Sequence, residues 1–252
     1  MKTFRLQVTH QPLPVQVVLL DVDEPTGKRL KNGLDQQFGE ERSLFMKCSV
    51  ESDEDIKAAL QSTIDTFGSI NILCNNAGIL REGDWEKTIS INLGGVIRMT
   101  YAALEHMNKL SGGQGGVVVN TSSVAGLDPL PSCPAYSATK HGVVAFTRAM
   151  AAASRASEYG IRFNVVCPVR VQTDISSPQF LKTLDSSPTC LVPCRNLQSE
   201  LWSRSLLDPF TNLLKSIFFW LLFGSFAPSF PRKYFIEWGK KNIFLQTPQE
   251  SA

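Results

Sequence analysis

Three residues near the middle of the chain have the types and the spacing that alcohol oxidation requires. Tyr136 and Lys140 are four residues apart and so share one face of a helix, and Ser123 ends the apolar run before it. A base must take the hydroxyl proton; a free phenol has a pKa of about 10, and a neighbouring ammonium favours its charged form. A serine hydroxyl can hold the substrate oxygen while charge develops on it. On spacing alone, Tyr136 and Lys140 also fit a polar pair on a helix surface.

The elements that must position these residues alternate between strand and helix patterns. Strands are predicted at 15–20, 44–50, 70–74, 117–119 and 161–167, and helices at 23–38, 52–68, 85–110 and 134–159. Strands separated by helices of this length imply parallel βαβ units, and continuously apolar strands fit a sheet covered on both faces. The sequence therefore predicts a single α/β domain over 15–173, with a doubly wound parallel sheet of the Rossmann type.

Local signals mark where the first two helices begin and end. Asp23 is a predicted N-cap, and Gly39 stops the helix that follows it. Ser52 and Asp55 form a capping-box-like start, and Gly68 ends the second helix. The glycine-rich residues 112–116 follow a helix and precede a strand, the reverse of a phosphate-binding loop, so a flexible turn is expected there.

Composition excludes several classes of protein. The formal net charge is +2 without a dense basic run, which gives no reason to expect a nucleic-acid partner. The cysteines and histidines lack zinc-site spacing, so no metal is expected, and buried reduced thiols fit a cytoplasmic protein. The apolar stretch at 13–20 runs into acidic residues, unlike a cleavable signal peptide.

Four motifs follow one another in an order that is specific to one enzyme family. They are Asn75-Asn76-Ala77-Gly78, Ile91-Asn92-Leu93, Asn120-Thr121-Ser122-Ser123 and Tyr136-x-x-x-Lys140-His141-Gly142. With these motifs and the family's usual distance between Ser123 and Tyr136, the chain resembles the short-chain dehydrogenase/reductase family over 15–173. Members of this family move hydride between a nicotinamide cofactor and an alcohol or ketone.

The resemblance implies a role for each polar residue of the motifs. Tyr136 would be the general base, Lys140 would lower its pKa and bind the nicotinamide ribose, and Ser123 would orient the substrate hydroxyl. Asn92 would hold a water in a proton relay, and Asn76 would line the cofactor channel. Taken by themselves, Asn92 fits a satisfied helix asparagine, and the segment around Asn76 fits a turn that ends a strand.

The resemblance further implies that NAD is the cofactor. Asp21 ends the first predicted strand, where an acid can bind the adenosine ribose hydroxyls and repel a 2′-phosphate, but it fits a turn-opening residue about equally well. Val171 and Thr173 would contribute to the cofactor site, and Cys133 would stand in the substrate loop. Residues 85–88, 112–116 and 140–148 most resemble the branch of the family that oxidises a secondary hydroxyl of a lipid, such as a prostaglandin, to a ketone. A homodimer is implied as well.

Both ends of the chain depart from the family. The family's first strand and its Gly-x-x-x-Gly-x-Gly loop, which brings backbone N–H groups to the pyrophosphate, do not precede Val15. Residues 1–14 form an atypical arm in which the alternation at 4–8 predicts a half-exposed edge strand. Ser49 replaces an aspartate that contacts adenine, and Val169 replaces a glycine.

Residues 174–252 form a divergent C-terminal segment with a predicted apolar helix near 213–226. Its core at 217–226 is shorter than the ~20 residues that span a bilayer, so packing on the sheet is favoured over an interfacial membrane anchor with basic flanks.

Two functions therefore compete. The first is an NAD-dependent alcohol dehydrogenase acting on a lipid alcohol. The alternative is a catalytically defective, truncated relative that serves only as a dimerisation partner or is an unstable product. Losing two backbone hydrogen bonds to phosphate, each worth about 1.5–3 kcal/mol, would weaken cofactor binding roughly a hundredfold or more.

Overall fold

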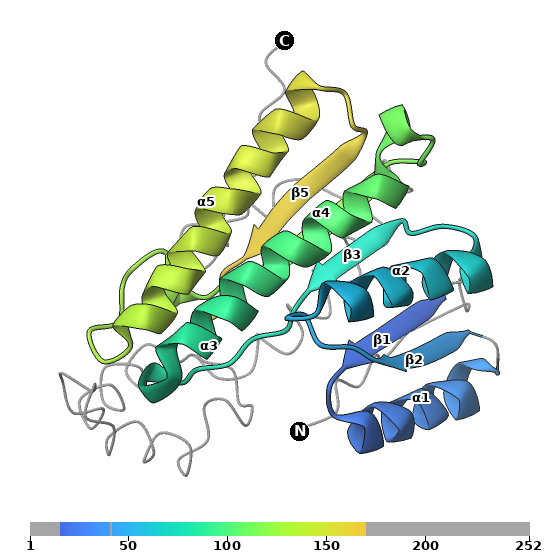
Figure 1. The fold of residues 1–252 in the computed structure, drawn as a ribbon, viewed down its shortest axis with the longest axis horizontal. Helices are drawn as coiled ribbons and strands as arrows, with labels where there is room; N and C mark the ends of the chain where they lie inside the picture. Colours follow the sequence, from blue (N-terminus) through green and yellow to red (C-terminus); the bar gives the residue numbers. More distant parts are fainter. Residues whose placement is uncertain (1–15, 41, 170–252) are drawn as a thin grey trace, which may run out of the picture.

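The computed structural model describes residues 16–40 and 42–169 (Figure 1). Its main elements are β1 (Val17–Asp21), α1 (Glu24–Phe38), β2 (Ser43–Lys47), α2 (Asp53–Phe67), β3 (Ile72–Asn75), α3 (Trp85–Ile89), α4 (Val96–Met107), β4 (Gly116–Thr121), α5 (Pro134–Ala156) and β5 (Ile161–Val166). The predicted alternation of strands and helices is confirmed over this range. The predictions for 1–14 and for 174–252, including the apolar helix near 213–226, lie outside the described residues.

The strands are all parallel, but they form two sheets. β1 pairs with β2, with Val17 opposite Ser43, and β4 lies between β3 and β5, with Ile72 opposite Val117. Within the described residues no ladder joins β1 to β3, although β1 is the strand of its sheet that lies toward β3 (Figure 1).

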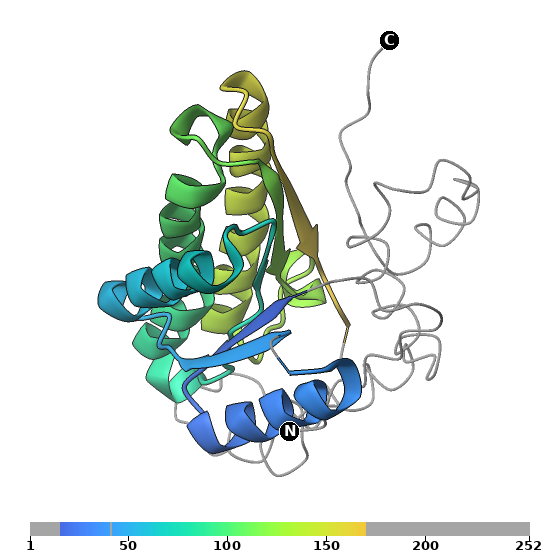
Figure 2. The same ribbon diagram turned by 90° about the vertical axis from the view of Figure 1, so that its right-hand side faces the viewer.

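Helices pack on opposite faces of these strands, as the doubly wound arrangement requires. The helices α2, α4 and α5 lie on one face (Figure 2), where their buried side chains join those of β3 and β4 in the main hydrophobic core. Leu20 and Met46 of the first sheet pack against the same core. Their neighbour Phe45 points the other way and contacts α1 at Gly27, where a Cβ would collide with the ring.

The expectation that the apolar strands are covered on both faces holds for β4 and is wrong for β1. Val117, Val118 and Val119 are all buried. Val17, in contrast, is 36% exposed, and the rest of β1 is only half-buried. An apolar strand is left partly exposed because it has a strand neighbour on one side only among the described residues.

Helix ends follow the local signals in the sequence. The Asp23 side chain accepts a hydrogen bond from the Thr26 N–H, and α1 ends at Gly39. The Ser52 hydroxyl accepts from the Asp55 N–H, and α2 ends at Gly68, whose φ of 82° is left-handed. The turn expected at 112–116 is also confirmed, with positive φ at three of its glycines.

The stretch predicted as one helix over 85–110 is interrupted. A π-helical segment, Ser90–Gly95, separates α3 from α4, and a 3₁₀ turn, Lys109–Ser111, follows α4. The sequence pattern does not reveal a π-helical turn, which inserts one residue per turn and is frequent at functional sites. No described helix is both long and apolar enough to cross a bilayer.

Candidate active site

The polar residues of the motifs gather at the carboxyl ends of β3 and β4. Because these strands are parallel and adjacent, Asn75 and Asn120 lie opposite each other, and the segments that follow them emerge at one edge of the sheet. A 3₁₀ turn, Val124–Gly126, carries the chain from β4 toward α5, and its N-cap is Ser123. Ligands of open α/β sheets bind at this edge, outside the carboxyl ends of the strands.

Tyr136 lies in the first turn of α5, half-buried and within hydrogen-bonding reach of Ser123. Burial raises the pKa of the phenol above its ordinary value, because desolvation disfavours the phenolate, and the Ser123 hydrogen bond acts in the opposite direction. The predicted Ser123–Tyr136 pair is therefore assembled. In the structure, the group that favours the phenolate is Ser123.

Lys140 lies one turn further along α5 and is almost completely buried. Its Nζ donates a 2.9 Å hydrogen bond to the Thr121 carbonyl and lies 5.6 Å from the centre of the Tyr136 ring. Burial lowers the pKa of this ammonium to about 8, against a smaller opposing effect of Cys167. The lysine is thus positioned beside the phenol and the end of β4, with a charge that its surroundings stabilise poorly.

Asn92 is fully buried in the π-helical segment, and its side-chain amide is hydrogen-bonded to the main chain of Ile79. The amide oxygen accepts from the Ile79 N–H at 2.7 Å, and the amide nitrogen donates to the Ile79 carbonyl at 2.8 Å. A longer bond of 3.3 Å reaches Thr139 on α5. Asn92 thereby fixes the loop after β3, whose Gly78 lies close to both the Asn92 amide and the Lys140 ammonium.

Asn76 and Asp21 lie at strand ends, as predicted. Asn76 is exposed, and its side-chain oxygen accepts a 3.1 Å hydrogen bond from Thr121, whose carbonyl binds Lys140. Asp21 ends β1, and its carboxylate accepts a 2.9 Å bond from the Asp23 N–H. Asp21 thus opens the turn before α1.

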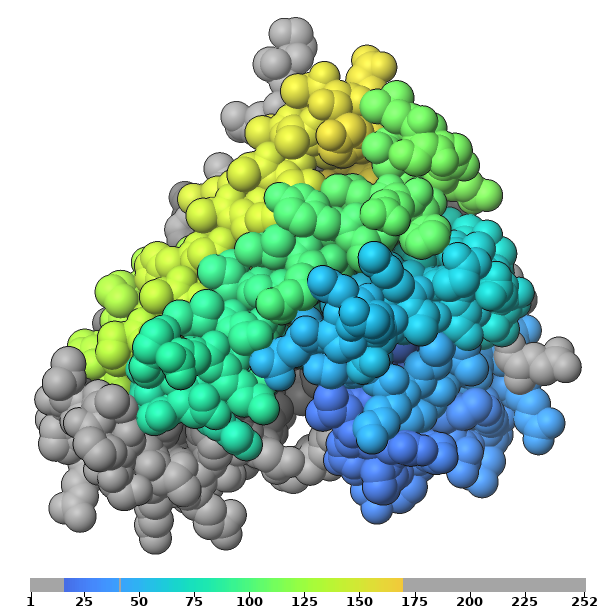
Figure 3. Space-filling view, in the orientation of Figure 1, coloured from blue at the N-terminus to red at the C-terminus, as the bar shows by residue number. Residues whose placement is uncertain are grey.

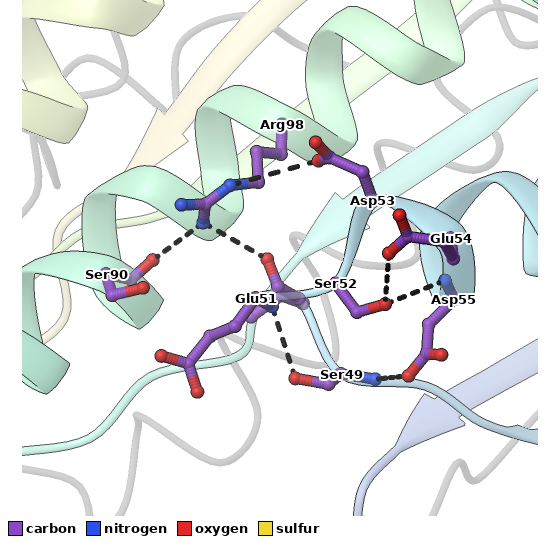
Figure 4. A network of polar contacts seen from close by, with 9 residues as sticks. Ser49, Glu51, Ser52, Asp53, Glu54, Asp55, Ser90 and Arg98 are labelled. Carbon is purple, nitrogen blue, oxygen red and sulfur yellow. Dashed lines mark hydrogen bonds and ion pairs between the residues drawn. The ribbon is translucent and has the colours of Figure 1, made fainter.

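Ser49 stands where the resemblance to the family implies an aspartate that contacts adenine, and a local network of hydrogen bonds surrounds Ser49 (Figure 4). The Ser49 N–H donates to the Asp55 carboxylate at 2.9 Å, so an acidic group does lie at the end of β2, supplied by α2. Arg98 on α4 donates to the carbonyls of Val50 and Ser90 at 3.4 and 3.2 Å. These bonds tie the start of α2 to the π-helical segment that holds the buried asparagine.

Of the remaining predicted site residues, Cys133 alone lies within the described ranges, next to the start of the helix that carries Tyr136. Cys133 precedes α5 and is buried, with its Sγ 3.5 Å from the Ser132 hydroxyl, and it contributes to raising the Tyr136 pKa. Val171 and Thr173 lie outside the described residues. No group of histidine, cysteine or acidic residues able to hold a metal occurs within 16–40 and 42–169.

Two motif residues, Asn75 and Asn120, are supported by Thr100 and Thr147, which have no recognisable signal in the sequence. Asn75 donates from its amide to Thr100 at 3.0 Å and to Asn120 at 2.9 Å, and Asn120 donates to Thr147 at 2.9 Å, all within the core. The network binds the ends of β3 and β4 to α4 and α5, because a buried amide left unpaired costs free energy. Glu82 also has no signal in the sequence. It precedes α3 in the chain, and its buried carboxylate lies at the start of α5.

Gly126 sets how closely the turn after β4 approaches α5. The Ser122 hydroxyl donates a 2.8 Å hydrogen bond to the Lys140 carbonyl, and a Cβ on Gly126 would collide with both oxygens. The absence of a side chain here therefore allows the Ser123 turn to reach the helix that carries Tyr136 and Lys140.

Comparison with known proteins shows which protein family has a matching sequence. A sequence model of the "short chain dehydrogenase" family matches residues 12–183. A curated relative, 15-hydroxyprostaglandin dehydrogenase [NAD(+)] of Rattus norvegicus, is 42% identical over 160 residues, which cover 64% of this chain and 60% of the relative. The chain therefore spans less than two-thirds of the length of that relative.

Solved structures agree with this assignment. A short chain dehydrogenase from Mycobacterium smegmatis is similar with a TM-score of 0.56 and 32% sequence identity, covering 64% of this chain and 67% of that one. A short chain dehydrogenase/reductase from Burkholderia phymatum, solved in complex with NAD, has a TM-score of 0.66 and 25% identity, covering 81% of this chain and 75% of that one.

Proposed function

The chain belongs to the short-chain dehydrogenase family, and from that membership we propose that it is an NAD-dependent oxidoreductase. Its substrate is the secondary hydroxyl of a lipid such as a prostaglandin, which it oxidises to a ketone. The observation that carries the proposal is the hydrogen-bonded pair of Ser123 and Tyr136 with Lys140 buried beside it. The 42% identity to an enzyme named for hydroxyprostaglandin supports the substrate class.

The chain's own residues handle the proton. Tyr136 takes the proton of the substrate hydroxyl, and Ser123 holds the same oxygen by a hydrogen bond. Burial raises the pKa of the phenol, and the Ser123 hydrogen bond favours its charged form. In our proposal the Lys140 ammonium, 5.6 Å from the centre of the ring, adds to this effect during the reaction. NAD supplies the hydride acceptor when it is bound.

The residues present fit the nicotinamide ribose and the adenosine ribose of NAD better than they fit its pyrophosphate. Lys140, Asn76 and Tyr136 would hold the nicotinamide ribose, beside Gly78, where a Cβ would approach the Lys140 Nζ to 3.6 Å. Asp21 would bind the adenosine ribose hydroxyls, and Asp55 offers a carboxylate at the end of β2. The described residues contain no glycine-rich loop for the pyrophosphate.

The remaining roles are also proposals. Asn92 would hold a water of the proton relay, and its side chain also fixes the loop beside Lys140. Cys133 borders the substrate site, and Val171 and Thr173, outside the described residues, complete the cofactor site. A cytoplasmic location fits the free thiols of Cys48, Cys74 and Cys167, and the resemblance to the family supports a homodimer.

Titration of the purified chain with NAD and with NADP tests the cofactor assignment. We expect NAD to bind at least about tenfold more tightly than NADP, because the Asp21 carboxylate repels a 2′-phosphate. Asp21→Asn should reverse or remove this preference while it keeps an oxygen that can accept the Asp23 N–H bond. Isothermal calorimetry gives both affinities.

Asp65→Asn is the matched control, since Asp65 lies on α2 and its described hydrogen bond is to Gln61. It should leave both affinities unchanged. If the folded chain releases no binding heat with NAD, or binds NADP equally well, the assignment of the cofactor is wrong for this chain.

One observation favours a second function, as a non-catalytic partner of an intact family member. The two sheets do not share a ladder, and the described residues offer no phosphate loop. The helices α4 and α5 nevertheless form one continuous outer face (Figure 3), on which Tyr101 is 54% exposed. Co-purification with an intact short-chain dehydrogenase supports this function, and alcohol-dependent NADH production by the chain alone excludes it.

A further inference from the structure

Helix α5, which carries Tyr136 and Lys140, begins without a cap of its own. Cys133 occupies the N-cap position, and its side chain makes no capping hydrogen bond. Pro134 follows at the first helical position and has no N–H, so Ala135 and Tyr136 supply the first N–H groups that need partners.

A buried carboxylate from another part of the chain supplies the missing cap. The Glu82 Oε1 accepts the Tyr136 N–H at 2.8 Å, and the Oε2 accepts the Ala135 N–H at 3.1 Å. Glu82 lies in the 3₁₀ turn Glu82–Asp84 between β3 and α3, and it is only 3% exposed. No ion pair within the described residues involves it, so the two N–H groups and the positive end of α5 stabilise its charge.

The segment that leads to Glu82 is itself held at two points. Before it, Ile79 is bound through its N–H and carbonyl to the Asn92 amide. Immediately before it, the Arg81 carbonyl accepts a 2.8 Å hydrogen bond from the buried Thr88 hydroxyl. The carboxylate is therefore fixed in space by the same loop that lies beside Lys140.

We propose that Glu82 is a positioning residue for Tyr136. By binding the backbone of Tyr136 itself, it fixes the first turn of α5 so that the phenol stays on the Ser123 hydroxyl and one turn from Lys140. The loop after β3 and the catalytic helix are thereby held as one unit. The inference rests on the proposed function, because it assigns Glu82 to the geometry of that same site.

Glu82→Gln is the informative variant. A glutamine keeps the length of the side chain but can accept only one of the two N–H groups, while its own amide N–H₂ faces the other. We expect kcat for alcohol oxidation to fall about 10–100-fold with KM for NAD changed less than about threefold, because small misplacements of a catalytic group are costly. Glu82→Asp, which keeps two acceptor oxygens, should recover part of the loss.

A readout without turnover separates this inference from the proposed function. The titration of the Tyr136 phenol, followed by NMR of labelled tyrosine and assigned with Tyr136→Phe, should move to higher pH in Glu82→Gln. The reason is that a displaced phenol loses the Ser123 hydrogen bond that favours its charged form. This result is expected even if the chain shows no turnover, in which case only the proposed function fails.

Glu86→Gln is the matched control, since Glu86 is exposed on α3. It should leave the Tyr136 titration and kcat unchanged. If Glu82→Gln lowers the melting temperature but leaves the Tyr136 titration and kcat as in the unaltered chain, Glu82 is a helix cap only and the inference is overturned. Should Glu82→Gln fail to fold, the same two measurements on Glu82→Asp decide.

Discussion

Tyr136→Phe should reduce alcohol-dependent NADH production by this chain about 10²–10⁴-fold, the contribution typical of a positioned acid–base group. The substitution removes the single atom that can take the substrate proton and leaves the ring in place. Ser123 cannot substitute for it, because its hydroxyl is assigned to hold the substrate oxygen and is itself a hydrogen-bond partner of the phenol. The measurement is the rate of NADH formation with a secondary lipid alcohol.

The fold should tolerate this change. Loss of one hydroxyl from a half-buried tyrosine costs on the order of 1 kcal/mol of unfolding free energy. Tyr101→Phe provides the control, since Tyr101 is 54% exposed on α4 and contacts Phe146 through its ring. A Tyr136→Phe variant that retains more than a tenth of the rate would show that another group accepts the proton.

Lys140→Met should make the chain more stable at neutral pH while it removes activity. Burial lowers the Lys140 pKa from 10.5 to about 8, so folding disfavours the ammonium. Each pH unit of such a shift corresponds to about 1.4 kcal/mol, so the variant should gain about 2 kcal/mol after loss of the Thr121 hydrogen bond. Active sites commonly trade stability for function in this way.

The gain should depend on pH with a definite sign. Between the folded pKa near 8 and the unfolded value of 10.5, the unfolded chain binds more protons, so the stability of the unaltered chain rises with pH. The advantage of Lys140→Met should therefore be largest below pH 8 and shrink as the pH rises toward 10.5. Ionisation of Cys48, whose pKa burial raises to about 11, affects both proteins alike and cancels in the difference.

Urea unfolding at a series of pH values checks this prediction. Lys57→Met, at an exposed position on α2, is the control and should change stability by less than about 0.5 kcal/mol throughout. An advantage of Lys140→Met that stays constant from pH 7 to 10.5 would contradict the assignment, because it would come from packing alone.

The parts of the fold that sequence predicts well are those with local signals. Asp23 and Ser52 cap their helices with their own side chains, and Gly39 and Gly68 end them, so a few neighbouring residues determine each boundary. The Ser123, Tyr136 and Lys140 set was predicted for the same reason. Ser123 ends one strand, and Tyr136 and Lys140 share one face of one helix, so neighbouring residues determine where each side chain lies. The order of the family's motifs indicates that the three belong together.

The parts that sequence does not predict depend on contacts between distant residues. The π-helical segment within 85–110 contains Asn92, whose side chain is hydrogen-bonded to Ile79. The hydrophobic periodicity of the sequence does not indicate these bonds. Glu82 would be placed on the surface by its type, yet it is buried because two N–H groups more than fifty residues later bind it. β1 is partly exposed and has one strand neighbour among the described residues, and a strand's own sequence does not report its neighbours.

The division of the strands into two sheets has a consequence for the order in which the chain opens. The unit β1–α1–β2 meets the rest of the described protein through side chains such as Leu20 and Met46, without a shared ladder. Such a unit can unfold locally at a lower free energy than the core around β4, and native-state hydrogen exchange would detect it. Asp21 lies in this unit and Lys140 outside it. A dinucleotide that touched both would bridge the two sheets, so binding would add the connection that the backbone does not make.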